Sequence, residues 1–305
     1  MLREGKPSMS APATHPAVTI RPVQTVAEYR ACQDIQRRAW GITEDGYVVP
    51  VATMISVQHA GGLVLGAFEG ERLIGFAFAY LGRVRGRWAL YSQLAGVDPS
   101  VQSHGVGGAL KLAQRAWARE QGLALVAWSY DPLQAGNANF NLHRLGAFSR
   151  TYLVNFFGER TDALNAGLET DRLLVEWPVE DRPRPWLGEG LEPVEAIASG
   201  ASVAGLRVPL GLSDAFHRLC AGTGAPAADH PLHLEIPADI AALKAQDLSL
   251  ARRWQQAVRE AFLRAFAAGY VAMDFHRHPG PEGPRAWYVL RRPAWAEDDE
   301  PAAHG

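Results

Sequence analysis

The sequence predicts a mixed α/β protein with a mixed sheet and two lobes, and three features lead to this prediction. Short apolar segments rich in β-branched residues alternate with longer segments of helical periodicity. This first series ends near residue 180, where residues 181–190 combine charged residues with two prolines and two glycines. Such a composition is typical of a linker, and a second, less regular series follows it.

The elements of the first lobe follow from periodicity and from start and stop signals. In residues 17–24 apolar and polar side chains alternate and several are β-branched, which predicts a strand. Thr25 is a helix N-cap candidate, and helical spacing continues to a glycine at residue 41. Pro50 suits the first turn of a second, short helix. The other predicted elements are a hairpin over 63–82, strands over 87–99, 123–130, 150–159 and 171–179, and helices over 105–121 and 137–148.

In the second lobe, residues 232–237, 270–276 and 286–292 are predicted strands. Residues 238–269 are predicted to form a long helix or a helix pair, because large apolar residues recur every four positions from Trp254. A helix, a glycine and a strand follow one another in both halves of the chain. The second lobe is therefore either a degenerate copy of the first or an ordinary α/β region.

The predicted organisation has five parts. They are a disordered lead-in over 1–16, a first domain over 17–180, a linker over 181–190, a C-terminal α/β lobe over 191–292 and an acidic, disordered tail over 293–305.

Composition restricts the class of protein. Hydrophobic residues make up 48% and charged residues 20% of the 305 residues, and the formal net charge is -2, so we expect neither nucleic acid nor a membrane as partner. The N-terminus has no apolar segment typical of a signal peptide. Cys32 and Cys220 are far apart, and the histidine clusters have no ligands at metal-binding spacing. We expect a cytoplasmic protein without a metal site.

A glycine-rich segment, VDPSVQSHGVGGAL, joins a predicted strand to a predicted helix. A P-loop requires Gly-Lys-Ser/Thr, but Ala109 follows the glycine pair 107–108. A dinucleotide fingerprint requires a third glycine where this chain has Leu110. The pattern Gln/Arg-x-x-Gly-x-Gly/Ala does fit residues 102–107. In such a loop, successive backbone N–H groups at a helix N-terminus can bind a pyrophosphate.

This segment resembles the coenzyme A pyrophosphate loop of the GNAT acetyltransferase superfamily. The positions specified in the commonest form of that loop are filled here by Val97, Pro99, Gln102, Gly105 and Gly107, with glutamine in place of the more usual arginine. The predicted element order over residues 17–180 also resembles the GNAT fold. The stretch 131–177 resembles a bacterial GNAT-like group whose members carry a second lobe, which says nothing about the acceptor.

The resemblance implies an N-acyltransferase that uses acetyl-CoA, with direct attack of a small amine on the thioester. It also implies that the fourth and fifth strands separate and that the pantetheine arm lies between them. Gly96 is unusual inside a strand, so we expect a bulge or a close backbone approach there, or else a plain kink. The residues expected to bind coenzyme A are Ala95, Gly96, Val97, Gln102, Ser103, His104, Gly105, Val106, Gly107 and Gly108.

The groups that would transfer protons are less well defined. Asp131 follows the predicted fifth strand and is the candidate general base, although Asp-Pro also begins ordinary turns. In many GNAT members a tyrosine of the fourth helix protonates the departing thiolate, but Leu142 stands at that position. Tyr130 and Tyr152 are the candidates to replace it.

Two hypotheses about function follow. The first is the N-acyltransferase, with the second lobe closing over the acceptor site. The second is a catalytically impaired coenzyme A-binding sensor or interaction protein, which the absent tyrosine favours. The second lobe could also be a dimer surface, so a homodimer is one expected form.

Overall fold

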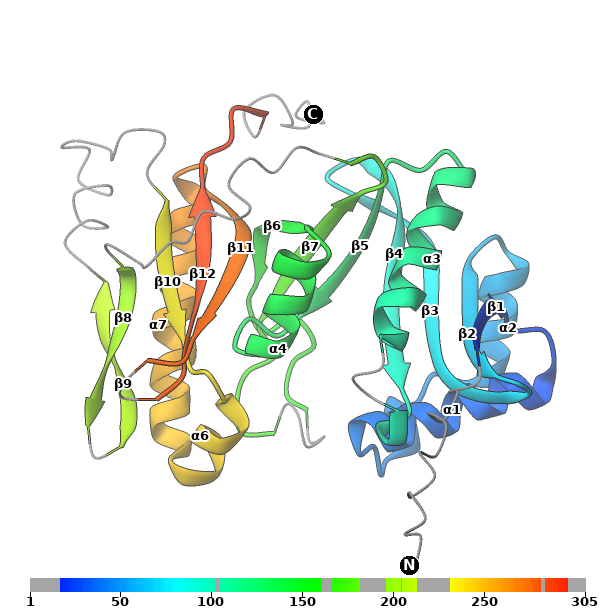
Figure 1. The fold of residues 1–305 in the computed structure, drawn as a ribbon, viewed down its shortest axis with the longest axis horizontal. Helices are drawn as coiled ribbons and strands as arrows, with labels where there is room; N and C mark the ends of the chain where they lie inside the picture. Colours follow the sequence, from blue (N-terminus) through cyan, green and yellow to red (C-terminus); the bar gives the residue numbers. More distant parts are fainter. Residues whose placement is uncertain are drawn as a thin grey trace, which may run out of the picture.

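The computed structural model describes residues 17–101, 105–160, 166–181, 196–203, 205–212, 231–280 and 283–295. The described strands form one mixed sheet in the order β1-β2-β3-β4-β5-β7-β6-β11-β12-β10-β8-β9. Figure 1 shows this sheet running from β1 at one end of the molecule to β9 at the other. The sheet therefore passes through both lobes.

The first lobe has the predicted order of elements. They are β1 (Val18–Pro22), α1 (Val26–Trp40), α2 (Val51–His59), β2 (Leu63–Glu69), β3 (Arg72–Val84), β4 (Arg87–Val97), α3 (Val106–Glu120), β5 (Leu125–Tyr130), α4 (Ala135–Ala138), β6 (Phe148–Leu153) and β7 (Arg172–Pro178). A π-helical turn over Asn139–Arg144 continues α4. The prediction of strands, hairpin and helices over this lobe is confirmed.

Local signals fix the start of the first helix as predicted. Thr25 caps α1, because its hydroxyl accepts from Glu28 N while the Glu28 carboxylate accepts from Thr25 N, both at 3.2 Å. Gly41 ends α1 in the left-handed conformation, with φ of 61°. The second helix is shorter than predicted, since Pro50 is its N-cap and not part of its first turn.

The second lobe contains the predicted strands and two more. Its elements are β8 (Ala196–Val203), β9 (Leu206–Leu212), β10 (Leu232–Ile236), α6 (Ile240–Gln246), α7 (Leu248–Ala267), β11 (Val271–His278) and β12 (Arg285–Arg291). Residues 238–269 form a helix pair, because Asp247 is extended and its side chain accepts from Leu250 N at 2.8 Å as the cap of α7. The small residues of β8 gave no strand signal, and Pro209 within β9 counted against a strand there.

Strand pairing in the two lobes is partly alike. The order β8-β10-β12-β11 has the same parallel and antiparallel neighbours as β4-β5-β7-β6. However, β9 follows its partner β8 in the chain, whereas β3 precedes its partner β4. The description of the second lobe as a degenerate copy therefore stays a prediction.

Helices cover the two faces of the first lobe's sheet differently. Alternate residues of β2 and β3 point to opposite faces, so Val64 and Phe76 pack with α1 and α2, while Leu65 and Ala77 pack with α3. Cys32 of α1 is buried on the first of these faces, and burial raises the pKa of its thiol to about 12. Cys220 lies outside the described residues.

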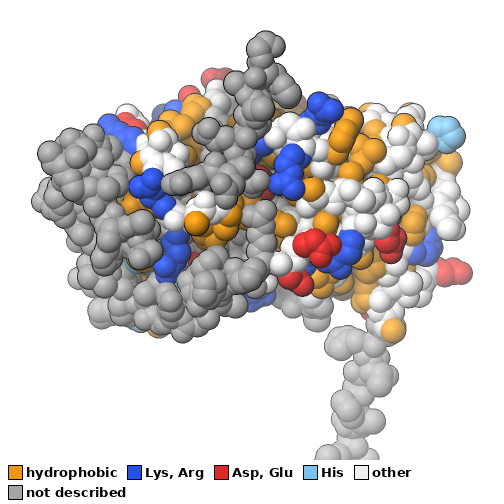
Figure 2. Space-filling view, turned by 90° about the horizontal axis from the view of Figure 1, so that it is seen from above, with side chains coloured by type: hydrophobic (Ala, Val, Ile, Leu, Met, Phe, Trp, Pro, Cys, Tyr) orange, Lys and Arg blue, Asp and Glu red, His pale blue; other side chains and the backbone are white. Residues whose placement is uncertain are grey.

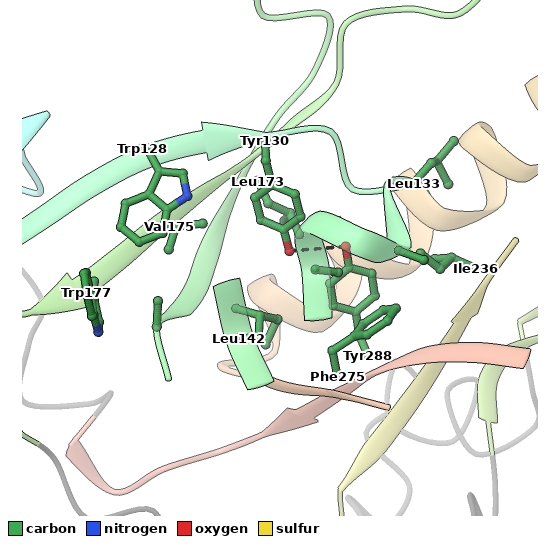
Figure 3. Close-up of a cluster of buried hydrophobic side chains, with 14 of the residues drawn as sticks. Trp128, Tyr130, Leu133, Leu142, Leu173, Val175, Trp177, Ile236, Phe275 and Tyr288 are labelled. Carbon is green, nitrogen blue, oxygen red and sulfur yellow. Dashed lines mark hydrogen bonds between the residues drawn. The ribbon is translucent and has the colours of Figure 1, made fainter. Parts of the chain in front are cut away.

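One hydrophobic core joins the lobes. Figure 3 shows a cluster to which the first lobe contributes Trp128, Tyr130, Leu133, Leu142, Leu173, Val175 and Trp177, and the second Ile236, Phe275 and Tyr288. The strands β6 and β11 meet through the single pair Ser149 and Ala272, so packing rather than a long ladder connects the lobes.

The predicted segments at the chain ends and between the lobes fall mainly outside the described ranges. Residues 1–16, 182–195 and 296–305 are not described, which leaves only Asp181 of the predicted linker. Trp295, near the predicted start of the tail, packs its ring 4.8 Å from that of Phe148.

The surface mixes charges of both signs. Figure 2 shows basic and acidic side chains interspersed with apolar ones over the described part of one face. Among the described helices, none combines the length and the apolar character needed to cross a membrane.

Candidate functional site

The strands β4 and β5 separate at their C-terminal ends. Their parallel ladder consists of Ala89, Leu90 and Tyr91 paired with Leu125, Val126 and Ala127. Both strands continue beyond this ladder, β4 to Val97 and β5 to Tyr130. We call the place beyond Tyr91 and Ala127 the strand fork. The separation that the resemblance implied is therefore present.

A bulge in β4 lies at this fork. Ala79 of β3 pairs with Ser92, and its neighbour Phe78 pairs with Leu94, so Gln93 is the extra residue of β4. The bulge expected at Gly96 is thus misplaced, since Gly96 pairs in register with Phe76. A Cβ at Gly96 would lie 3.1 Å from the Phe76 ring and 3.4 Å from the side chains of Ile35 and Trp40, so side chains, not a backbone, crowd this position.

A cleft of about 340 Å³ opens between β4 and the N-terminus of α3. We call it the glycine-lined cleft. Its lining residues are Ala39, Trp40, Ala95, Gly96, Val97, Val101, Gly105, Val106, Gly107, Gly108, Phe140 and Arg144. Every described residue that was predicted to bind coenzyme A lies in this lining. Gln102, Ser103 and His104 lie outside the described residues.

The start of α3 suits a negatively charged ligand. Gly105 is the helix N-cap in the left-handed conformation, with φ of 81°, which other residues adopt rarely. Added Cβ atoms at Gly107 and Gly108 would each have their nearest described neighbour at 3.9 Å, an ordinary van der Waals contact, so neither glycine is crowded. Backbone N–H groups and the helix dipole there favour phosphate, and the exposed Arg144 adds a positive charge to the same cleft.

A second cavity of about 420 Å³ lies in the fork itself, since residues of both β4 and β5 line it, and we call it the aromatic pocket. It shares Trp40, Ala95 and Phe140 with the glycine-lined cleft. Its other lining residues are Ile42, Tyr47, Val49, Ser92, Gln93, Leu94, Lys111, Trp128, Ser129, Tyr130, Asp131, Gln134, Asn137, Asn141, Phe157, Arg160 and Arg172. The two cavities therefore meet beside the end of β4.

Asp131 lies in the aromatic pocket, directly after β5. One carboxylate oxygen accepts from Leu133 N at 2.9 Å, and the other accepts from Gln134 Nε2 at 3.5 Å. Burial raises the pKa of this carboxyl, while those two hydrogen bonds and the charge of Arg172 oppose the increase. The carboxylate thus stabilises the turn that begins at Asp131, and it is also a titratable group in the lining of the pocket.

The two candidate tyrosines donate their hydroxyl protons elsewhere. Tyr130 lines the aromatic pocket, but its hydroxyl donates to Tyr288 Oη at 3.2 Å. Tyr152 does not line this pocket, and its hydroxyl donates to Asp171 Oδ2 at 2.7 Å. Leu142, at the position of the usual tyrosine, is fully buried in the core (Figure 3).

Tyr152 belongs to a polar contact between the lobes. Its partner Asp171 also accepts from two nitrogen atoms of Arg259 on α7, both at 2.8 Å. Burial and the Asp171 charge raise the pKa of Tyr152 well above its ordinary value. The structure therefore does not bring Tyr152 together with Tyr130 and Asp131 at the pocket.

Lys111 is a pocket residue that sequence reasoning missed. Only 5% of this α3 lysine is exposed, and its Nζ donates to Ser92 Oγ at 2.9 Å. The same Nζ lies 3.7 Å from the centroid of the Trp128 ring. Burial lowers the pKa of Lys111 to about 7. The only sequence signal was its place on the helical face that also carries Leu110 and Gln114.

Other charged residues of the two cavities gave no sequence signal. Arg144 lines the glycine-lined cleft, and Arg160 and Arg172 line the aromatic pocket. Arg160 lies over the Tyr47 ring, 4.3 Å from its centroid. Within the described ranges, no group of three or more histidine, cysteine or acidic side chains could hold a metal ion.

Comparison with known proteins gives structural matches only. No protein-family model and no curated protein matches the chain. Among solved structures, the ribosomal-protein-S18-alanine N-acetyltransferase from Escherichia coli is 19% identical, with a TM-score of 0.44, covering 58% of this chain and 99% of its own. An N-acetyltransferase from Staphylococcus aureus Mu50 is 15% identical, with a TM-score of 0.44 and coverage of 54% and 99%. The yncA protein from Salmonella typhimurium, solved with its cofactor acetyl-CoA, is 20% identical, with a TM-score of 0.43 and coverage of 55% and 98%.

Residues beyond the first lobe form a further region. In the first lobe, the element order, the separation of β4 from β5 and the glycine-rich start of α3 occur together. The first lobe therefore has the element order, the strand separation and the glycine-rich helix start that the resemblance to the GNAT fold predicted.

Proposed function

We propose that the protein is an N-acyltransferase that moves an acetyl group from acetyl-CoA to a small amine. The observation that carries this proposal is the meeting of two cavities at the strand fork. One is the glycine-lined cleft at the start of α3, and the other is the aromatic pocket that contains Asp131. Donor and acceptor would occupy these two cavities and meet beside Ala95.

The glycine-lined cleft fits the donor. The N-terminus of α3 would hold the pyrophosphate through backbone N–H groups, with Arg144 as a further positive charge. The pantetheine arm, which is extended and carries amide groups, would lie along β4 between Ala95 and Val97, where β5 has separated from it. Bound acetyl-CoA supplies the activated acetyl thioester.

The aromatic pocket fits a small acceptor. Its aromatic side chains can surround an apolar body, and its charged side chains can orient polar groups. Asp131 would take a proton from the acceptor ammonium, because burial raises the pKa of this carboxyl toward the range where it can accept protons efficiently. The free amine would then attack the thioester carbon directly.

The test combines binding with turnover. Calorimetry with acetyl-CoA measures donor binding, and release of free thiol in the presence of a panel of amines and amino acids measures transfer. We expect binding and, for at least one acceptor, thiol release well above the rate without acceptor. Absence of acetyl-CoA binding would contradict the placement of the donor.

A second function, a coenzyme A-binding sensor without transfer activity, is favoured by one specific observation. Leu142 is fully buried, and the hydroxyls of Tyr130 and Tyr152 donate to other residues, so none of the three offers a proton to a thiolate. This function predicts acetyl-CoA binding in the calorimeter without thiol release across the whole panel. The same experiment therefore separates the two functions.

A further inference from the structure

Lys111 lies at the apex of the strand fork. The ladder between β4 and β5 ends with the pair Tyr91 and Ala127, and the next residues of the two strands are Ser92 and Trp128. The Lys111 Nζ contacts both, at 2.9 Å from Ser92 Oγ and 3.7 Å from the Trp128 ring centroid. A single amine thus occupies the point where the two strands begin to diverge.

The hydrogen bonds at this point leave part of the amine for other contacts. Ser92 Oγ donates its only proton to Gln114 Oε1 at 3.0 Å, so it can only accept from Lys111. Lys111 also lines the aromatic pocket together with Ser92 and Trp128. The remaining positions on Nζ can therefore interact with a molecule in that pocket.

The same place is connected to the position where a tyrosine is absent. Trp128 Nε1 donates to Asn141 Oδ1 at 3.2 Å, and Asn141 precedes Leu142 in the π-helical turn. The face of the Trp128 ring contacts Lys111, and its edge contacts this turn. Lys111 and the π-helical turn that contains position 142 therefore contact the same Trp128 side chain.

The surroundings allow Lys111 to give up and regain a proton near neutral pH. Burial alone lowers its pKa to about 7, while the Trp128 ring favours the charged form. The other charged or titratable residues that line its pocket are Tyr47, Tyr130, Asp131, Arg160 and Arg172. Around α3, the charged groups pair with one another, as Arg115 with Asp181, Arg119 with Glu180, Arg72 with Asp98 and Arg21 with Glu28.

We propose that Lys111 is the proton donor to the departing thiolate, in place of the tyrosine that is absent at position 142. This inference rests on the proposed acyltransferase function. As the acceptor nitrogen bonds to the acetyl carbon, the C–S bond breaks and its electron pair goes to sulfur. The Lys111 ammonium gives a proton to that sulfur, and the resulting neutral amine takes up the proton that the acceptor nitrogen loses.

The acceptor nitrogen loses two protons in this reaction, and each is taken up by a different group. Asp131 removes the first proton, which converts the acceptor ammonium to the attacking amine. Lys111 exchanges the second, which passes from the acceptor nitrogen to the thiol. The lysine ends the reaction in the charge state in which it began, and no oxidant or metal is required.

The first experiment measures the titration of Lys111 directly. The chain has three lysines, Lys6, Lys111 and Lys244, so protein labelled with ¹³C at lysine Cε gives a spectrum with few signals. The signal that disappears in Lys111→Met belongs to Lys111. We expect it to titrate near pH 7. Titration near the ordinary lysine value of about 10.4 would overturn the proposal, because the group would then stay charged.

The second experiment measures the rate of thiol release against pH for wild type, Lys111→Met and Lys244→Met. Loss of a general acid should lower kcat of Lys111→Met about 100-fold and remove the pH-dependent limb near 7, while the KM for acetyl-CoA stays nearly unchanged. Lys244 is in α6, outside both cavities, and its charge lowers the pKa of Asp131, so Lys244→Met should keep the limb near 7 and shift only the acidic limb that belongs to Asp131. Thermal unfolding and acetyl-CoA calorimetry of Lys111→Met show whether the variant is folded.

The outcomes distinguish this inference from the proposed function. If the wild type releases thiol and Lys111→Met does so at the same rate with the same pH profile, the function stands and the role of Lys111 is wrong. If the wild type binds acetyl-CoA without thiol release for any acceptor, the acyltransferase itself is wrong, and the role of Lys111 is overturned with it. Loss of both the rate and the pH limb in a folded variant supports the proposal.

Discussion

The hydroxyl groups of Tyr130 and Tyr288 lie 3.2 Å apart in the buried core between the two lobes (Figure 3). Tyr288 in turn donates to the carbonyl oxygen of Pro132 at 2.6 Å. Burial raises the pKa of Tyr130 above its ordinary range, and that of Tyr288 rises well above it. These hydroxyls therefore stay protonated, and they attach the second lobe directly behind Asp131.

Replacing Tyr288 with phenylalanine should destabilise the protein by about 1–3 kcal/mol, because the Pro132 carbonyl loses its donor and Tyr130 its acceptor inside the core. Urea unfolding followed by fluorescence measures the change. Tyr80→Phe is the control, since its hydroxyl bond to Gln93 is exposed to water and its loss should cost less. Equal costs for the two variants would contradict the structural role of the buried pair.

The Asp131→Asn variant should lower the rate of thiol release by about 10²–10⁴-fold, because the amide cannot accept the acceptor's proton. Asparagine still accepts from Leu133 N, so the turn is retained. Wild-type activity should fall as the pH drops through the raised pKa of Asp131, since the protonated carboxyl is no base. Asp239→Asn, which changes a helix cap remote from both cavities, is the control. Equal activity of the two variants would exclude Asp131 as the base.

Gly107→Val should weaken acetyl-CoA binding more than tenfold, as measured by calorimetry, because its side chain would project from the start of α3 into the glycine-lined cleft. Among the described residues, the added Cβ has one neighbour within 4 Å, the Val97 side chain at 3.9 Å, so the fold should tolerate it. Ala116→Val, on the exposed face of the same helix, should leave binding unchanged. Wild-type affinity in Gly107→Val would show that the pyrophosphate binds elsewhere.

Lys111→Met should be more stable than wild type at neutral and acidic pH. The folded-state pKa is lowered from 10.5 to about 7, so the unfolded chain binds the additional proton and the charged lysine disfavours folding below that range. At about 1.4 kcal/mol per pKa unit, this cost is on the order of 5 kcal/mol near pH 6, less the lost contacts with Ser92 and Trp128.

The difference between the two proteins should decrease as pH rises from 7 towards 10, because the folded lysine is then neutral and the proton that the unfolded lysine must lose on folding costs less as the pH approaches 10.5. Thermal unfolding of both proteins at pH 6, 8 and 10 measures it. A difference independent of pH would mean that the folded-state pKa of Lys111 is not lowered.

Most of the first lobe could be predicted because its signals are local. The capping box at Thr25 acts within one helical turn, and the alternation in β2 and β3 identifies their faces within one hairpin. In the second lobe, β8 and β9 were not predicted, because small residues in β8 carry little periodic hydrophobic signal and Pro209 in β9 counts against a strand. The position of the bulge was also missed, since it depends on the register of β3 against β4.

The sequence by itself determined the order of elements and the glycine-rich start of α3, because helix caps, turns and strand alternation depend on neighbouring residues. Only the tertiary structure decided which side chains can transfer a proton. The hydroxyls of Tyr130 and Tyr152 donate to residues far away in the sequence, and Lys111 is buried between two strands that separate beside it. Burial, hydrogen-bond partners and pKa depend on these distant contacts, which no local pattern records.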